Sequence, residues 1–252
     1  MTKSLPPASA SRLTIFKNTY LQAPLWLHRL VVRDSTYEDV LDGVPTNVAR
    51  RKQRALKRLL WFWPRIDQAS KWADADTGTA WAPENYLHSH RTRLVQKINE
   101  VVPKDASLLE LGCNCGSDLN ILATDGYCDL SGMDASSRAL DLFRREYPAT
   151  YALAKPRHDL FQSYLMAMPS LAVDYTYSNG ATIELVHPSF PIVREICRVT
   201  RKGVLLDLSE RHQGFARDYR RQFARSGFEV TFCDETEQVT GQSSLIVFLR
   251  KA

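Results

Sequence analysis

The C-terminal part of the chain, residues 104–252, alternates short apolar runs with amphipathic stretches of helical periodicity. Strands that alternate with helical patterns of about ten to fifteen residues are typical of βαβ units, which build a parallel sheet. Only Asp234–Gln242 separates the last two runs, which is too short for a crossover helix, so we expect an antiparallel hairpin there. The pattern predicts a mostly parallel α/β sheet with one reversed strand at its end. The apolar runs are Ser107–Leu111, Asp129–Met133, Val173–Tyr177, Gly203–Leu208, Glu229–Cys233 and Ser244–Leu249.

The composition excludes several classes of protein but does not indicate a function. The chain has 252 residues, of which 44% are hydrophobic and 24% charged, and these values are close to the average for soluble globular proteins. Collagen, coiled coil and wholesale disorder are therefore excluded. No apolar run approaches the ~20 residues that span a bilayer, and the N-terminus lacks the apolar segment of a secretory signal. We expect a cytoplasmic protein with reduced, buried cysteines, because the five cysteines are odd in number and lie in apolar contexts.

The most informative segment is LLELGCNCG, which runs from Leu108 to Gly116. An apolar strand leads directly into a turn that contains Gly112 and Asn114, and a helical pattern begins at Ser117. Glycine, and to a lesser degree asparagine, adopts the left-handed backbone conformation that such a turn needs. The exposed N–H groups of the turn can bind an anion. Taken alone, the segment is equally consistent with an ordinary tight turn between a strand and a helix.

An acid at the end of the next strand makes the turn a candidate for nucleotide binding. The segment LSGMD ends at Asp134, about 20 residues beyond the glycines, where nucleotide-binding sheets place an acid that accepts hydrogen bonds from ribose hydroxyls. The alternative is that Asp134 only caps a helix over Ser136–Glu146. The turn and the acid together indicate a cofactor that carries adenosine. Glu110, at the end of the first strand, would repel a pyrophosphate and suits a cationic or amino-bearing ligand instead, which disfavours a dinucleotide.

The segment ELGCNCG from Glu110 to Gly116 resembles the first motif, (D/E)-x-G-x-G-x-G, of class I S-adenosylmethionine-dependent methyltransferases. Asn114 stands in place of the middle glycine. Further segments resemble the family's later motifs in the family's order. They are GMD at 132–134, HDL at 158–160, DYTYSNG at 174–180, IELVHP at 183–188, GVLLDL at 203–208 and GFE at 227–229.

The resemblance covers residues 83–252 and implies an S-adenosylmethionine-binding domain there. The implied fold is a Rossmann-like, doubly wound, seven-stranded sheet, mostly parallel with one antiparallel strand near the C-terminus and with helices on both faces. Residues 1–82 would form a helical N-terminal extension, and residues 81–103 have the pattern of a lead-in helix. The resemblance is specific for fold and cofactor and leaves the substrate open.

The cofactor implied by the resemblance is S-adenosylmethionine, with S-adenosylhomocysteine as its product. Glu110 would anchor the amino group, and Asp134 would hold the ribose. Asn179 would lie near the sulfonium or serve only as a turn residue, and Tyr86 and Arg91 would lie near the carboxylate or be a packed and a surface residue. The implied cofactor-binding residues are Glu110, Gly112, Asn114, Gly116, Met133, Asp134, Ala135, Asp159, Leu160, Asn179, Tyr86 and Arg91, of which Met133, Ala135 and Asp159 would border or bind the adenine.

Methyl transfer from a sulfonium is an in-line displacement, so the protein mainly has to position the acceptor. An oxygen acceptor often needs a general base. His187 and His212 follow the fourth and fifth strands, and Glu184 lies three residues before His187 on the same helix-entry face. The alternatives are that His187 forms a structural turn with Pro188 and that His212 is a surface residue. No set of metal ligands is evident, because Cys113-x-Cys115 lacks a second pair, so we expect metal-independent transfer.

The acceptor is expected to be a small or medium organic molecule, with an oxygen of a saccharide, lipid or secondary metabolite as the first choice. A non-catalytic cofactor-binding scaffold that binds a partner is one alternative. An RNA methyltransferase is another, although nucleic acid is disfavoured because residues 178–181, SNGA, lack the (N/D/S)-P-P-(Y/F) motif of enzymes that methylate flipped DNA bases.

Residues 48–63 form a separate signal, because apolar residues recur there at helical spacing among six arginines and lysines. The simpler interpretation is a helix docked on the catalytic domain with a solvated basic face. The other is contact with an anionic surface such as lipid headgroups or an acidic partner. No feature of the sequence indicates an oligomeric state.

Overall fold

The computed structural model describes residues 82–87, 92–179, 183, 186, 190–208, 218–238 and 241–251. The predictions for residues 1–81, including the helical extension and the basic segment 48–63, lie outside the described residues and stay predictions. Within the described part of the chain, no helix has the length and apolar character needed to cross a membrane.

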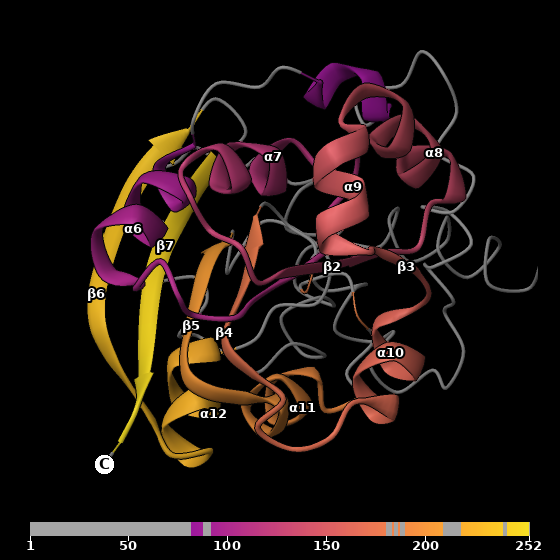
Figure 1. The fold of residues 1–252 in the computed structure, drawn as a ribbon. Helices are drawn as coiled ribbons and strands as arrows, with labels where there is room; N and C mark the ends of the chain where they lie inside the picture. The colour runs from indigo at the N-terminus through magenta and orange to yellow at the C-terminus, as the bar shows by residue number, and fades with distance from the viewer. Residues whose placement is uncertain are drawn as a thin grey trace, which may run out of the picture. The chain divides into compact units, whose positions relative to one another are not determined.

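The strands form one seven-stranded sheet in the order β3-β2-β1-β4-β5-β7-β6 (Figure 1). Strand β7 runs antiparallel to both of its neighbours, β5 and β6, and every other pair is parallel. The predicted sheet with a single reversed strand is therefore confirmed. The strands are β1 (Leu108–Leu111), β2 (Leu130–Asp134), β3 (Arg157–His158), β4 (Val173–Asn179), β5 (Thr200–Leu208), β6 (Phe228–Gln238) and β7 (Gly241–Arg250).

Helices cover both faces of the sheet, as the sequence predicted. Helices α6 to α9 lie on one face, and α10 to α12 lie on the other (Figure 1). Helices α9 and α10 were not predicted from the sequence. The helical elements are the 3-10 helix η2 (Pro83–Tyr86) and the α-helices α6 (Arg93–Val101), α7 (Ser117–Thr124), α8 (Ser137–Glu146), α9 (Pro148–Ala154), α10 (Phe161–Ala167), α11 (Ile192–Val199) and α12 (Tyr219–Arg225).

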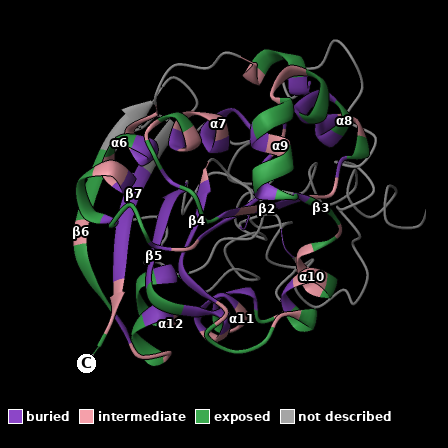
Figure 2. Ribbon diagram, in the orientation of Figure 1, coloured by how far each residue is buried: buried purple, intermediate pink, exposed green. Residues whose placement is uncertain are grey.

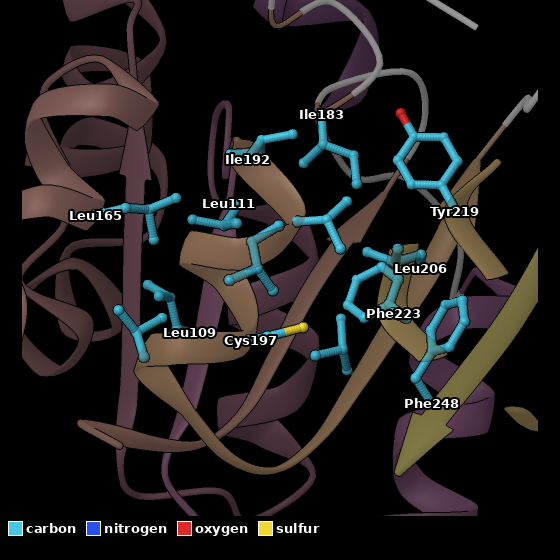
Figure 3. Packing of buried hydrophobic residues seen from close by; sticks show 14 of the residues in the cluster. Leu109, Leu111, Leu165, Ile183, Ile192, Cys197, Leu206, Tyr219, Phe223 and Phe248 are labelled. Carbon is cyan, nitrogen blue, oxygen red and sulfur yellow. The ribbon is translucent and has the colours of Figure 1, made fainter. Parts of the chain in front are cut away.

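Alternation of side chains along the strands builds a core on each face of the sheet. In β1, Leu109 and Leu111 belong to the core under α10 to α12, whereas Leu108 belongs to the core under α6 to α9. The central strands β1, β4 and β5 are mostly buried between the two helical layers, whereas the edge strands β3 and β6 are largely exposed (Figure 2). In the first core the rings of Phe223 and Phe248 stack with centroids 4.1 Å apart (Figure 3). Burial on both faces explains why the strands read as apolar runs.

The predicted lead-in helix is two elements rather than one. The 3-10 helix η2 ends at Tyr86, because Leu87 adopts an extended conformation with ψ at 141°. Helix α6 begins at Arg93, after Thr92, whose hydroxyl accepts a hydrogen bond from the backbone N–H of Val95 at 3.2 Å. A threonine that caps a helix in this way starts a new helix rather than continuing an earlier one.

Gly116 sets how closely α8 approaches the turn after β1. Its φ is +76°, and a Cβ placed on it would lie 2.3 Å from the ring of Phe143, a residue of α8. The side-chain-free backbone therefore lets the Phe143 ring pack directly on the residue that precedes α7. Gly126 also has a positive φ, +98°, but a Cβ there would meet no atom within 4 Å.

We predict that Gly116→Ala lowers the free energy of unfolding by about 2–5 kcal/mol, because it adds overlap with Phe143 to backbone strain. The matched control Gly126→Ala adds strain alone and should lose about 1–2 kcal/mol. Urea unfolding of both variants measures the difference. Equal losses would contradict the packing of Phe143 on Gly116.

Candidate functional site

The turn after β1 is folded against the end of β2. Gly112, Asn114 and Gly116 all have positive φ, at 79°, 47° and 76°. The backbone N–H groups of Gly112 and Cys113 both donate to the carbonyl oxygen of Met133, at 2.9 and 3.0 Å. Two glycines and one asparagine thus provide the left-handed residues that the sequence predicted for this turn.

Asp134 joins this turn to the start of α8. Its Oδ2 accepts the backbone N–H of Asn114 at 2.8 Å, and its Oδ1 accepts the backbone N–H of Ser136 at 2.8 Å. The hydroxyl of Ser136 is the N-cap of α8, because it accepts from the backbone N–H of Ala139. Asp134 therefore does more than cap a helix. Burial raises the pKa of Asp134, although the two backbone donors oppose that effect.

Glu110 is a buried acid in the middle of the sheet. Its neighbour in the register of β4 is Tyr177, whose hydroxyl donates to Glu110 Oε2 at 3.0 Å. Only 3% of Glu110 is exposed. Burial raises the pKa of Glu110 well above its usual range, the nearby Asp118 raises it further, and the Tyr177 hydroxyl offsets only part of the rise.

Asp118 is a second buried acid, in the first turn of α7. Its Oδ2 accepts a hydrogen bond from Nδ2 of Asn179, at the end of β4, at 2.7 Å. Burial raises the pKa of Asp118, the Asn179 amide lowers it, and Asp207 raises it. Asn179, predicted to lie near the sulfonium or to serve only as a turn residue, thus connects the end of β4 to α7.

Asp207 and Arg93 form an ion pair that sequence analysis did not identify. Arg93, the first residue of α6, donates from Nε and Nη2 to the two carboxylate oxygens of Asp207, at 2.7 and 2.8 Å. Asp207 is the neighbour of Asn179 in the register of β4 and β5. Arg93 also lies 3.6 Å from a carboxylate oxygen of Asp234. This positive charge is therefore already matched by acids.

We call Glu110, Asp118 and Asp134 the carboxyl cluster. Within the described residues, each of the three accepts hydrogen bonds only from neutral groups: a tyrosine hydroxyl, an asparagine amide and backbone N–H groups. Asp118 and Asp134 both raise the pKa of Glu110. No group of three or more acids, cysteines or histidines among the described residues is arranged to hold a metal ion.

A buried acceptor adds to this arrangement. The side-chain oxygen of Asn114 is shielded from solvent and accepts no hydrogen bond from any described residue. A buried polar atom without a partner costs about 1–3 kcal/mol, so such an atom in a glycine turn is suited to a ligand that donates a hydrogen bond. The turn thus presents an acceptor to a ligand that donates a hydrogen bond.

The remaining predicted cofactor residues lie around the ends of β2 and β3. The backbone N–H of Asp159 donates to the carbonyl oxygen of Asp134 at 3.1 Å, and Asp159 Oδ1 accepts the backbone N–H of Leu160 at 2.7 Å. Ala135 is half-buried, and its carbonyl oxygen lies 3.0 Å from Nε2 of His158. The side chain of Met133, in contrast, is buried in the hydrophobic core under α10 to α12.

Tyr86 lies against the start of α7, because its carbonyl oxygen accepts a hydrogen bond from the hydroxyl of Ser117 at 2.6 Å. Burial raises the pKa of the Tyr86 hydroxyl. The other predicted residues, namely Arg91, Glu184, His187 and His212, lie outside the described residues.

Comparison with known proteins places this fold. No family model and no curated protein sequence matches the chain. Solved structures match the chain. One is magnesium protoporphyrin IX methyltransferase from Synechocystis PCC 6803 with bound S-adenosylmethionine, which is 13% identical in sequence. The TM-score is 0.56, and the match covers 75% of this chain and 99% of that one. The chain has the fold of the class I S-adenosylmethionine-dependent methyltransferases.

Two other solved structures have this methyltransferase fold, with similar sequence identities and TM-scores. A TehB-like S-adenosylmethionine-dependent methyltransferase from Corynebacterium glutamicum is 17% identical, with a TM-score of 0.55 over 67% of this chain and 98% of that one. A methyltransferase solved in complex with the Haloferax volcanii activator Trm112 is 16% identical, with a TM-score of 0.55 over 69% of this chain and 95% of that one. The fold implied by the sequence motifs is confirmed.

We predict that Glu110→Gln stabilises the protein increasingly as pH rises. Because folding raises the pKa of Glu110, the folded state holds the proton more tightly, and stability falls as pH rises from about 4.3 toward the folded-state pKa. The amide cannot ionise, and its oxygen can still accept from Tyr177. The variant should gain about 1.4 kcal/mol over wild type for each unit by which folding raises that pKa.

Urea unfolding between pH 4 and pH 8 measures this gain. Glu229→Gln, on the exposed side of β6, is the control and should show no such pH-dependent gain. A constant difference between Glu110→Gln and wild type at all pH values would contradict the burial of an ionisable Glu110.

Proposed function

We propose that the protein is an S-adenosylmethionine-dependent methyltransferase whose product is S-adenosylhomocysteine. The observation that carries the proposal is the 2.8 Å hydrogen bond between the Asn114 N–H and Asp134, which places a glycine turn and a strand-end acid together beside buried carboxyls. The cofactor supplies an electrophilic methyl group on a positively charged sulfur. A ligand of this kind matches both the negative character of the carboxyl cluster and the methyltransferase fold.

Asp134 and the turn hold the nucleoside. Each oxygen of the Asp134 carboxylate accepts one backbone N–H and retains a second lone pair, so both can accept from the ribose hydroxyls. Ala135, Asp159 and Leu160 border the adenine, and Asp159 keeps one carboxylate oxygen for its exocyclic amine. Met133 acts indirectly, since its side chain lies in the core and its carbonyl oxygen holds Gly112 and Cys113.

The carboxyl cluster and the lead-in segment hold the methionine part. The backbone from Gly112 to Gly116 passes along it, and Glu110 interacts with its amino group. Asn179, fixed by Asp118, lies on the side of the sulfonium. Tyr86 lies near its carboxylate. Arg91 is outside the described residues, and its proposed role is to form a charge-assisted pair with that carboxylate.

The acceptor enters at the carboxyl ends of β4 and β5, the edge of a parallel sheet where ligands bind. We propose metal-independent transfer to an oxygen of a small or medium organic molecule, with Glu184, His187 or His212 as the general base. Methyl transfer from radiolabelled S-adenosylmethionine into fractionated cell extract tests the activity and the acceptor class together. Label in small-molecule fractions supports the proposal, label in RNA would replace its acceptor class, and no transfer would favour a non-catalytic scaffold.

Asp134→Asn should weaken S-adenosylmethionine binding at least about tenfold, because the ionised carboxylate that accepts from the ribose is lost. The asparagine oxygen can still accept one backbone N–H, which limits damage to the turn. Asp129→Asn is the matched control, since Asp129 is exposed and precedes the opposite end of β2. Calorimetric titration measures both, and equal affinity for Asp134→Asn and wild type would remove Asp134 from the site.

If a histidine is the base, the rate of methyl transfer should rise with pH through the neutral range, because only the neutral imidazole accepts a proton. Replacing the true base among Glu184, His187 and His212 by glutamine or alanine should lower kcat about 10²- to 10⁴-fold and leave cofactor affinity unchanged. Single-turnover rates of the three variants test this. Full activity in all three would show that the base lies elsewhere.

A further inference from the structure

The carboxyl cluster has more buried acids than the described cations can match. Arg93, which lies beside the cluster, gives its hydrogen bonds to Asp207 and lies close to Asp234. Among the described residues, Glu110 and Asp118 accept hydrogen bonds only from Tyr177 and Asn179, whose donor groups are neutral. Buried acids without a positive partner make the surrounding space favourable for a cation.

The proposed reaction changes the charge of the ligand in this space. Transfer breaks the bond between the methyl carbon and sulfur, and the electron pair of that bond stays on sulfur. The methyl carbon forms a new bond to the acceptor, whose proton leaves to a base. The cofactor therefore enters with a positive sulfonium and leaves as a neutral thioether that otherwise has the same shape and the same amino and carboxylate groups.

We propose that the carboxyl cluster selects the positively charged form, so that S-adenosylmethionine binds more tightly than S-adenosylhomocysteine, with Asp118 as the specificity-determining residue. This inference rests on the proposed function. The sulfonium charge is lost at the moment of transfer, which lowers the affinity for the product and promotes its release.

Asp118 carries this role for geometric reasons. It lies in the first turn of α7, where the helix dipole favours a negative charge, and its carboxylate is fixed by Asn179 at the open end of β4. Glu110 lies deeper, beneath the Tyr177 hydroxyl, and Asp134 is occupied with the turn and the ribose. Of the three acids, Asp118 is therefore the one that interacts with the positive charge on the sulfur.

The selection depends on pH, because the acids of the cluster take up protons when no cation is near. A positive ligand favours the ionised carboxylates, so its affinity rises as pH rises through the raised pKa of Asp118, and binding releases protons. The affinity for a neutral ligand rises less when these carboxylates ionise. The other charged or titratable groups around the cluster are Arg93 from α6, Cys113 and Cys115 from the turn, His158 from β3, Tyr177 from β4 and Asp207 from β5.

Calorimetric titration of the full chain with each ligand between pH 5 and pH 7 tests the proposal. In this range the amino group of both ligands stays protonated, so differences report the protein. Wild type should bind S-adenosylmethionine more tightly, by a ratio that grows with pH. Repeating the titration in buffers of different ionisation heat should show proton release on binding S-adenosylmethionine and less on binding S-adenosylhomocysteine.

The variant Asp118→Asn removes the charge and keeps an oxygen that can accept from Asn179. It should lower the affinity ratio about tenfold or more and reduce its growth with pH. Asp141→Asn, an exposed carboxylate on α8, is the matched control and should keep the wild-type ratio. Thermal unfolding of both variants establishes that they are folded at the pH values used.

Equal affinity for the two ligands, or tighter binding of S-adenosylhomocysteine, would overturn the inference while the proposed function stands. Preference for the charged ligand that survives in folded Asp118→Asn would overturn the assignment to Asp118. If wild type binds neither ligand, the proposed function fails and the inference fails with it.

Discussion

The hydrogen bond from the Asn114 N–H to Asp134 joins the two halves of the site. A single carboxylate fixes the turn after β1 through one oxygen and the start of α8 through the other. Parallel pairing of β1 with β2 brings the two segments side by side, and the two N–H groups of the turn that bind the Met133 carbonyl hold them there. Packing of Phe143 on Gly116 then fixes α8 against the same turn.

Buried acids are the second constraint. Register alone places Glu110 beside Tyr177 and Asn179 beside Asp207, so the sheet determines which polar groups meet. An ionised carboxylate without a positive partner is costly in an apolar interior, and folding therefore favours the protonated forms of Glu110 and Asp118. A cationic ligand reverses that preference. We propose that this cost in stability is what makes the site suited to a cationic sulfonium.

Much of this arrangement could be predicted from the sequence because it depends on local patterns. Apolar runs mark the strands, and the glycine turn needs residues that tolerate positive φ. The segment Asp234–Gln242 is too short for a crossover helix and therefore requires a hairpin, in which most of it extends β6 and β7. Asp134 could be placed because a strand end and a helix start lie on either side of it in the sequence.

The parts that could not be predicted depend on contacts between distant segments. Arg93 and Asp207 are 114 residues apart, and only the docking of α6 near the end of β5 brings them together. In the sequence, Asp118 resembles any acid in the first turn of a helix, where acids are common. Its burial results from the packing of α7 on the sheet, which the sequence pattern does not show. The interrupted lead-in helix follows from the capping of α6 by Thr92, a signal that was present in the sequence and was outweighed by helical periodicity.

We propose that the site binds an adenosine cofactor with a cationic sulfur rather than one with a pyrophosphate. Equilibrium dialysis of the full chain against radiolabelled S-adenosylmethionine, with and without excess NAD, tests it most directly. We expect saturable binding of one S-adenosylmethionine per chain that NAD does not displace. Binding of NAD by a protein that ignores S-adenosylmethionine would contradict it.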